Sequence, residues 1–186
     1  MLIRPARKDD ARAIAGFIAM AESEMVHHFT GTTDPEKSLD ALVPFITSPT
    51  PNRYSLENNL VVEEDGKAAA AMISFAADLQ PKLDILLLET LNKRGYNLDR
   101  LFFEGAPGTY YLSTMGVDPA YRGRGFGSAL MKAAEERARE LGFAQTSLLV
   151  SMGKPRAMGL YERVGYVPTE EVQIADVKYH RMIHTL

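Results

Sequence analysis

Residues Val117 to Leu130 read V-D-P-A-Y-R-G-R-G-F-G-S-A-L, and this stretch decides the fold. The strand-like run Tyr110–Val117 leads into the glycine-rich turn Arg122–Gly127, and a long helical pattern follows directly. Glycines at such a junction let several backbone N–H groups converge on one point, where the positive end of the helix macrodipole also lies. The strand–turn–helix sequence therefore predicts an anion-binding site that suits a phosphate group.

Two well-known phosphate loops do not fit these glycines. The P-loop pattern requires Gly-Lys-Ser/Thr after the glycines, and no such tripeptide follows them. The dinucleotide pattern G-x-G-x-x-G requires its last glycine at position 128 or 130, where Ser128 and Leu130 stand. It also requires an acidic residue at the end of the next strand, which here ends Leu148–Ser151. Both interpretations are excluded.

The remaining pattern is R-x-x-G-x-G, formed by Arg122, Gly125 and Gly127, with V-x-P at 117–119. It resembles the acetyl-coenzyme A signature of the GNAT superfamily of N-acetyltransferases. A second block, A-x-x-L-Y-x-x-x-G-Y at 157–166, is similar to the helix-to-strand segment of that family. The resemblance is strongest between these blocks and weaker over the rest of the chain. It implies acetyl-CoA as the acyl-donor cosubstrate and an amine as the acceptor.

The resemblance also implies an α/β sandwich, with a mixed, mostly antiparallel central sheet of about six or seven strands flanked by helices. No repeat and no linker interrupts the chain, so we expect one acetyltransferase domain over residues 1–186. Strands are predicted at Ile3–Ala6, Leu60–Glu63, Ala69–Phe75, Tyr110–Val117, Thr146–Val150, Tyr166–Val167 and Val177–Thr185. Helices are predicted after a cap at Asp9 or Asp10 and through Met25, around Leu39–Ile46, at Lys82–Arg94, from Phe126 to about Leu141, and at Pro155–Val164. The helix that begins at Phe126 is expected to bury a stripe that ends at Leu141 and to expose Glu135.

Composition and charge narrow the classes of partner. Hydrophobic residues make up 46% and charged residues 24% of the 186 positions, which is typical of a globular domain. The formal net charge of −3 gives no reason to expect nucleic acid or an anionic membrane as a partner. No apolar run approaches the ~18 residues of a membrane span, and the first residues lack the apolar core of a secretory signal. We therefore expect a cytoplasmic protein.

The sequence contains no cysteine, and this limits the mechanism. Disulfides, thiolate metal sites and a cysteine nucleophile that would carry the acetyl group are excluded. The simplest acyltransferase built from this chain therefore transfers the acetyl group directly, within a ternary complex. The four histidines show no metal-binding spacing within one helical motif, and no metal is expected.

The resemblance assigns two stretches to the coenzyme. The first, which would bind the pyrophosphate through its N–H groups, comprises Arg122, Gly123, Arg124, Gly125, Phe126, Gly127 and Ser128. The second matches the backbone that binds the pantetheine arm and faces the thioester carbonyl, and comprises Met115, Gly116 and Val117. The side chains of Met115 and Val117 can pack in the core at the same time. Gly116 inside a strand independently predicts a bulge or a close backbone approach.

Tyr161 matches the tyrosine of the family that donates a proton to the leaving thiolate. A phenol with a pKa near 10 can protonate a thiolate whose conjugate acid has a pKa of about 8.5. A core position is the alternative for an aromatic residue on an amphipathic helix. Lys154 departs from the family, which often has asparagine there in contact with the coenzyme arm. The lysine can reach a phosphate or face water, and Ser151 is the nearest small polar residue.

No glutamate stands on the predicted strand Tyr110–Val117, so the general base is open. The candidates for the base lie elsewhere in the chain, and each is typical of a solvated surface group: Glu22, Glu24, His27, His28 and Glu104. The acceptor is expected to face residues 22–54 and 79–104, which carry acids and aromatics. Small amine, aminoglycoside-like amine, peptide N-terminus and protein lysine all stay open as acceptors.

Three hypotheses follow. The first is an acetyl-CoA-dependent N-acetyltransferase that acts on a primary amine of a small molecule or peptide. The second is a non-catalytic acyl-CoA-binding or sensor domain of the same fold, favoured by Lys154 and by the missing strand glutamate. The third is a nucleotide-binding domain unrelated to coenzyme A. The use of longer acyl-CoAs and the oligomeric state are open, and a homodimer fits the superfamily.

Overall fold

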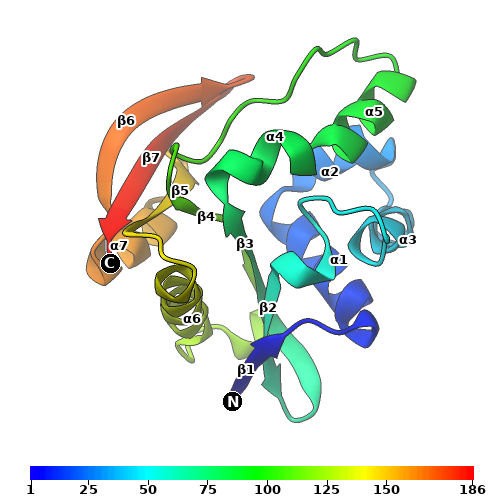
Figure 1. Ribbon diagram of the computed structural model, residues 1–186. Helices are drawn as coiled ribbons and strands as arrows, with labels where there is room; N and C mark the ends of the chain where they lie inside the picture. The colour runs from blue at the N-terminus through cyan, green and yellow to red at the C-terminus, as the bar shows by residue number, and fades with distance from the viewer.

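A seven-stranded mixed sheet forms the centre of the protein, and helices cover both of its faces (Figure 1). The computed structural model describes residues 1–186. The strands lie in the order β1-β2-β3-β4-β5-β7-β6, and every neighbouring pair is antiparallel except β4 and β5. Their bounds are β1 Leu2–Pro5, β2 Asn59–Glu64, β3 Lys67–Ala76, β4 Tyr110–Val117, β5 Gln145–Ser151, β6 Val167–Ile174 and β7 Val177–Thr185. The predicted fold class is confirmed.

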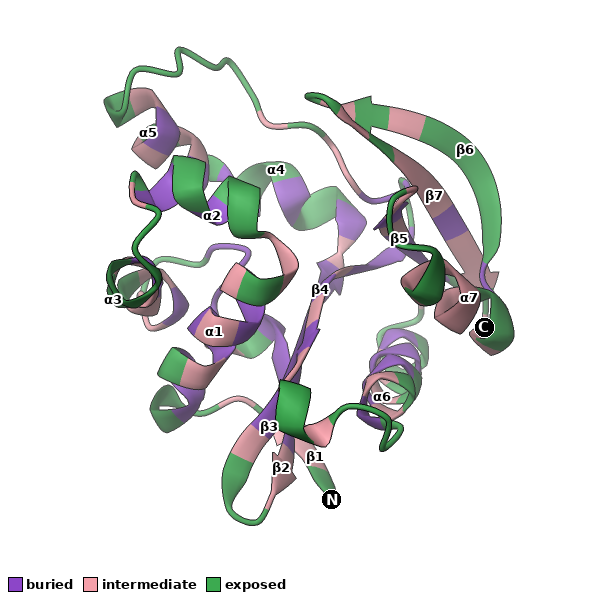
Figure 2. Ribbon diagram, turned by 180° about the vertical axis from the view of Figure 1, so that it is seen from behind, coloured by how far each residue is buried: buried purple, intermediate pink, exposed green.

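The first five helices cover one face of the sheet, and the last two cover the other (Figure 1). The first group is α1 Ala11–Ala21, α2 Ser23–Thr30, α3 Pro35–Ile46, α4 Gln80–Leu83 and α5 Ile85–Lys93. The second is α6 Phe126–Glu140 and α7 Pro155–Val164. Short 3-10 turns lie at Lys8–Asp10, Leu56–Asn58, Ala77–Leu79 and Pro119–Tyr121. Each face of the sheet has its own hydrophobic cluster, and Figure 2 shows the largely buried strands β3 and β4 between α1 and α6.

Helix α6 packs on the sheet through a stripe of residues spaced four apart. Phe126, Leu130, Ala134 and Ala138 are all at most 4% exposed, as the 3.6-residue period predicts. Leu141, predicted on the same stripe, is 58% exposed because it lies beyond the last helical turn. Two polar side chains, Glu135 of α6 and Asp10 before α1, also differ from the prediction, because each has a partner elsewhere in the chain.

Glu135 was predicted on the wet face of α6, but it is only 5% exposed. Its Oε1 lies 3.0 Å from Nδ1 of His184 on β7, so the carboxylate is buried with a polar partner. Asp10 was predicted to cap the first helix through its side chain, and it does not. Its carboxylate accepts instead from the N–H of Arg7 and from the guanidinium of Arg4.

The first predicted helix is two helices. α1 ends at Ala21 and α2 begins at Ser23, because Glu22 leaves helical geometry at φ −127° and ψ 39°. The predicted helix Lys82–Arg94 is likewise divided, at Asp84, which ends α4 and precedes α5. In both places the acidic side chain at the break is bonded to a distant part of the chain. The local sequence does not encode these contacts.

Strand β4 carries a bulge, but not at Gly116. The β3–β4 register pairs Ile73 with Thr114 and Ser74 with Leu112, so Ser113 is the extra residue. At Gly116 the other expected feature is present: an added Cβ would lie 2.5 Å from Cβ of Phe17 and 2.9 Å from its backbone. Gly116 is therefore a place where α1 approaches the sheet closely.

Candidate active site

The parallel strands β4 and β5 pair only at their first residues. Tyr110 pairs with Thr146 and Tyr111 with Ser147, and no further pair joins the two strands. β5 continues to Ser151 while paired along its other edge with β7, and β4 continues to Val117 while paired with β3. The two strands therefore separate after Tyr111, and the edges that face the gap have no strand partner.

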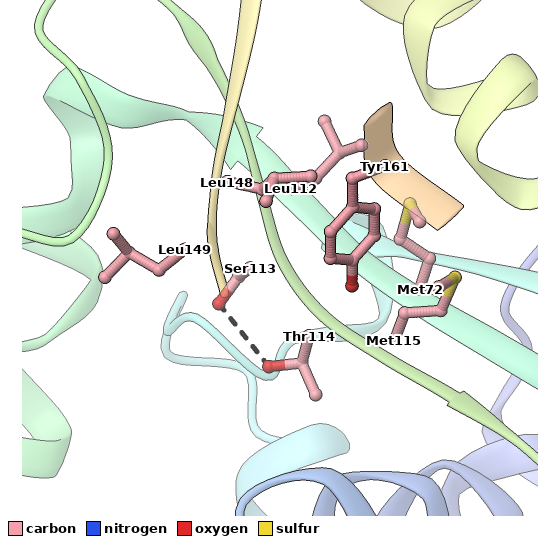
Figure 3. Close-up of a pocket in the computed structure, with 8 residues that line it drawn as sticks. All are labelled: Met72, Leu112, Ser113, Thr114, Met115, Leu148, Leu149 and Tyr161. Atoms are coloured by element: carbon pink, nitrogen blue, oxygen red, sulfur yellow. Dashed lines mark hydrogen bonds between the residues drawn. The ribbon is translucent and has the colours of Figure 1, made fainter. Parts of the chain in front are cut away.

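A small cavity of about 20 Å³ lies in this gap (Figure 3). Its lining comes from β3, β4, β5 and α7: Met72, Leu112, Ser113, Thr114, Met115, Leu148, Leu149 and Tyr161. The ring of Tyr161 extends from α7 into this space, and its hydroxyl faces the part of β4 that carries Thr114 and Met115 (Figure 3). The gap thus brings a phenol next to strand backbone that has no β-sheet partner.

The glycine-rich turn lies between β4 and α6. Gly123 and Gly125 have φ values of 78° and 81°, in the left-handed region that favours glycine. The N–H groups from Gly123 to Gly125 donate to no acceptor in the protein. Those from Phe126 to Ser128 form the first turn of α6, where an α-helix has no acceptor four residues earlier. Six consecutive donors are therefore free at the positive end of the helix.

Two arginines flank these donors. Arg122 turns back along the chain, where its Nε lies 3.4 Å from the carbonyl oxygen of Val117 and its Nη2 lies 3.1 Å from the sulfur of Met20. The guanidinium of Arg124 lies 5.1 Å from the ring centre of Tyr121. Neither arginine has an acidic partner, so both charges can act on an anion at the turn.

The residues predicted for the coenzyme arm lie beside the turn. Met115 and Val117 are half-buried and pack against the cluster that α6 covers, as expected for strand residues. The sulfur and methyl of Met115 would be 3.4 Å from a Cβ at position 127, so Gly127 leaves the space between α6 and β4 open. Phe126 is buried and stacks on Tyr121 with ring centres 6.0 Å apart, and Ser128 is exposed.

Tyr161 is half-buried, and its hydroxyl makes no hydrogen bond within the protein. Burial raises the pKa of this phenol above its usual value of 10.0, so the hydroxyl keeps its proton at neutral pH. Its ring meets that of Tyr166 edge-on, with centres 6.3 Å apart. Lys154 precedes α7 and reaches across to α1, where its Nζ donates to the carbonyl oxygen of Ala21 at 3.2 Å.

A glutamate from the α1–α2 junction lies against β4. Glu22 is half-buried and accepts hydrogen bonds from Oγ1 of Thr114 and from the hydroxyl of Tyr54. Burial and the nearby charge of Glu104 raise the pKa of this carboxyl above its usual 4.5. Sequence reasoning placed Glu22 among several surface acids, because the position follows a continuous helical pattern.

The other base candidates are placed differently. Glu24, His27 and His28 are exposed on α2, where Nδ1 of His28 lies 2.7 Å from the hydroxyl of Tyr96. The carboxylate of Glu104 is in an ion pair: Arg53 donates to its Oε1 at 2.8 Å. Its other oxygen accepts from the hydroxyl of Tyr111 at 2.8 Å. These four groups are thus exposed or already paired.

Arg53 is the centre of a buried ion-pair network. It is 4% exposed and donates to both oxygens of Asp84, at 2.6 and 2.7 Å, as well as to Glu104. Gln80 joins the network through a 3.0 Å bond to Asp84. The network connects the segment before β2, the α4–α5 break and the loop before β4, all on the side of the gap where Glu22 lies.

Comparison with known proteins identifies the family. The profile of the "Acetyltransferase (GNAT) family" matches residues 23–166, which is more than half of the chain. The chain belongs to the GNAT acetyltransferase family. The members of this family are described as acetyltransferases.

Solved GNAT structures share the whole fold. A crystal structure of an acetyltransferase is 30% identical with a TM-score of 0.81, and the match covers 100% of this chain and 99% of that one. An N-acetyltransferase from Staphylococcus aureus Mu50 is 25% identical with a TM-score of 0.85, covering 98% and 100%. The structural similarity therefore extends beyond the two sequence blocks to the full chain.

Curated relatives match over a shorter region. An acetyltransferase of Yersinia pestis (strain Pestoides F) is 29% identical over 72 residues, 39% of this chain and 50% of that protein. Mycothiol acetyltransferase of Propionibacterium freudenreichii is 38% identical over 77 residues, 40% of this chain and 24% of that protein. The matched region thus spans half or less of these relatives. No helix of this GNAT chain has the length and apolar composition to cross a bilayer.

Proposed function

We propose that this GNAT protein is an N-acetyltransferase that moves an acetyl group from acetyl-CoA directly to a primary amine, through a ternary complex. The observation that carries the proposal is the gap between β4 and β5. It opens next to six free N–H donors, and Tyr161 reaches into it. In this proposal one acetyltransferase domain, residues 1–186, contains all of these parts.

In this proposal the turn holds the pyrophosphate of the coenzyme. The N–H groups of residues 123–128 donate to phosphate oxygens, and the helix macrodipole and the side chains of Arg122 and Arg124 add positive potential. Lys154 swings from the carbonyl oxygen of Ala21 to a phosphate or to the coenzyme arm, a movement that its exposed, flexible side chain allows.

The pantetheine arm follows the unpaired edge of β4. There the backbone groups of Met115, Gly116 and Val117 take the place of strand partners for its amides, and bring the thioester to the cavity. Tyr161 then protonates the departing sulfur. Since burial raises its pKa, the phenol is protonated at the pH of the reaction and can act as a general acid.

The acceptor approaches from the side of the gap where α1, α2 and the loop before β4 lie. Glu22 is on this side and Glu104 adds negative charge there, which favours an amine that arrives as a cation. We propose a small molecule or peptide as the acceptor. A non-catalytic sensor is disfavoured for two reasons. The family that matches is a family of enzymes, and Glu22 contacts β4 although no residue of β4 is a glutamate.

Thiol release from acetyl-CoA in the presence of a panel of amines tests the proposal. It is paired with thermal-shift measurements using acetyl-CoA, CoA, ATP and NAD. A ligand at 100 times its Kd adds about 2.7 kcal/mol to the free energy of unfolding. We expect acetyl-CoA and CoA to stabilise the protein and amines to release thiol. Stabilisation by CoA without thiol release would indicate the sensor, and preferential stabilisation by ATP or NAD would indicate a nucleotide-binding domain.

A further inference from the structure

Glu22 differs from every other glutamate of the chain. It is the one glutamate that is not fully exposed and has no cationic partner: Glu63 and Glu104 pair with arginines, Glu64 with the N-terminus and Glu135 with His184. Its two partners are the neutral hydroxyls of Thr114 and Tyr54. A half-buried carboxylate costs free energy unless it is paired, so this position calls for a functional explanation.

We propose that Glu22 is the catalytic base that takes the proton of the acceptor ammonium, and that Glu104 is a positioning residue that tunes Glu22 through its charge. This inference rests on the proposed acetyltransferase function. It deepens that function by naming the base, which the sequence left open, and by specifying that the acceptor arrives as a cation.

Glu22 and Tyr161 approach β4 from opposite faces of the sheet, because α1 and α2 cover one face and α7 the other. Thr114 donates to Oε1 of Glu22, and the same residue lines the cavity into which Tyr161 extends. A carboxylate has about four lone-pair sites, so the two hydroxyl donors leave capacity for an ammonium N–H. An amine bound at Thr114 thus has a base on one side and, across the thioester, an acid on the other.

Glu104 lacks the free capacity that a base needs. Its Oε1 accepts from Arg53 and its Oε2 accepts from Tyr111. Arg53 is itself fixed by two bonds to Asp84, so the ion pair is rigid and buried. With both oxygens engaged, Glu104 acts on Glu22 as a nearby negative charge rather than as a proton acceptor.

The groups around Glu22 come from every neighbouring element. Glu104 precedes β4, Arg53 and Tyr54 precede β2, and Thr114 lies on β4. Tyr111 on β4, Tyr179 on β7 and the exposed Glu24 on α2 complete the set, and Tyr179 lies within the field of Glu22 and Glu104. Burial and Glu104 raise the pKa of Glu22, and Arg53, Thr114 and Tyr54 oppose the rise. The net effect is a raised pKa of Glu22, which makes it a stronger base than a surface carboxylate.

Glu22 and Tyr161 supply the base and the acid of the acetyl-transfer step. Glu22 takes one proton from the ammonium, and the freed electron pair of the nitrogen forms the new C–N bond to the acetyl carbon. The C–S bond breaks and its electron pair leaves on the sulfur of the coenzyme, which takes the hydroxyl proton of Tyr161. The amide nitrogen loses its remaining excess proton to water, and Glu22 and Tyr161 return to their starting states by exchange with solvent.

Glu22→Gln and Glu104→Gln test the inference, with Glu136→Gln as a matched control on the exposed face of α6. Each variant is assayed for the pH dependence of kcat/KM, for Kd of CoA and for thermal stability. We expect Glu22→Gln to lower kcat about 100-fold or more and to remove the acid limb of the profile, with Kd of CoA unchanged. We expect Glu104→Gln to keep most of the activity and to shift the acid limb to lower pH.

Where Glu104→Gln does not fold, Tyr54→Phe replaces it. This variant removes a hydrogen bond to the ionised form of Glu22, and the acid limb then moves to higher pH. Wild-type turnover in Glu22→Gln, or an acid limb that stays in place in Glu104→Gln or in the Tyr54→Phe variant that replaces it, would overturn the inference while acetyl transfer by the parent stands. A parent protein that binds CoA but acetylates no amine would overturn the proposed function, and this inference with it.

Discussion

Thr114 donates its side-chain hydroxyl to Glu22, a residue 92 positions earlier in the chain. This contact joins the break between α1 and α2 to the strand that borders the gap. Thr114 also lines the cavity, so this one residue links the helix break to the place where we propose that the substrates meet.

Thr114→Val removes this hydrogen bond with little change in volume. The bond lowers the pKa of Glu22, so its loss raises that pKa, and we expect the acid limb of the kcat/KM profile to move to higher pH. Thr114→Ser, which keeps the hydroxyl, should retain the wild-type profile. An unchanged limb in Thr114→Val would show that Thr114 has no influence on the base.

Glu22→Gln is expected to stabilise the fold at alkaline pH. The pKa of Glu22 is higher in the folded state than its ordinary 4.5, so the folded protein holds this proton more tightly than the unfolded chain does. The wild type therefore loses stability relative to the glutamine variant as pH rises from about 4.5 through the folded pKa. Urea denaturation at pH 4 and pH 8 measures the difference. A variant less stable than wild type at pH 8 would contradict the argument.

Tyr161→Phe is expected to lower kcat by about 10²- to 10⁴-fold, the usual contribution of a general acid. The hydroxyl has no partner in the protein, so its removal breaks no structural bond and should leave the melting temperature nearly unchanged. Kd of CoA, measured by calorimetry, should also stay at the wild-type value. Full activity in this variant would exclude Tyr161 as the acid.

Gly125→Ala and Gly142→Ala form a matched pair at the two ends of α6. Both glycines have φ above 80°, and neither has any atom within 4 Å of an added Cβ, so each substitution should cost about 1–2 kcal/mol of stability for the same backbone reason. Only Gly125→Ala should weaken CoA binding. Alanine keeps the backbone N–H, but the strain at this φ moves the turn, and the loss of one hydrogen bond to a charged phosphate costs about 1.5–3 kcal/mol, or roughly 10- to 100-fold in Kd.

Equal Kd values for CoA in the two alanine variants would indicate that the turn does not hold the phosphates. Titration calorimetry at one fixed salt concentration makes the comparison, since contacts to phosphate weaken as ionic strength rises.

Gly116→Ala and Gly16→Ala should change stability in opposite directions. A Cβ at position 116 would collide with the side chain and backbone of Phe17, so we expect a loss of about 1–3 kcal/mol or more. A Cβ at position 16, inside α1, meets nothing within 4 Å and should add about 0.5–1 kcal/mol. Urea denaturation measures both. Destabilisation by both substitutions would show that helix propensity does not decide the effect at position 16.

Much of the fold could be predicted because its signals are local. Pro155–Val164 and Val177–Thr185 were predicted with the bounds that the structure has, since proline, glycine and apolar periodicity mark their ends. Asp65 and Gly66 predict a hairpin between the expected strands Leu60–Glu63 and Ala69–Phe75, and both residues have positive φ as such a turn requires.

The features that were missed depend on partners far away in the sequence. The helix break at Asp84 accompanies its bond to Arg53, 31 residues earlier, and the burial of Glu135 accompanies its bond to His184, 49 residues later. The bulge at Ser113 depends on the register with β3, which a single strand does not reveal. The roles of Tyr161 and of the turn at 122–128 remain predictions that the variants above test.

Only two β-sheet residue pairs join the strands β1 to β4 to the strands β5 to β7: Tyr110 with Thr146, and Tyr111 with Ser147. A bound molecule with amide groups in the gap would form hydrogen bonds to the unpaired strand edges, and would extend the sheet as an added strand does while it is bound. Each catalytic cycle would then dismantle and rebuild part of the secondary structure, and amide exchange along β4 should slow when the donor site fills.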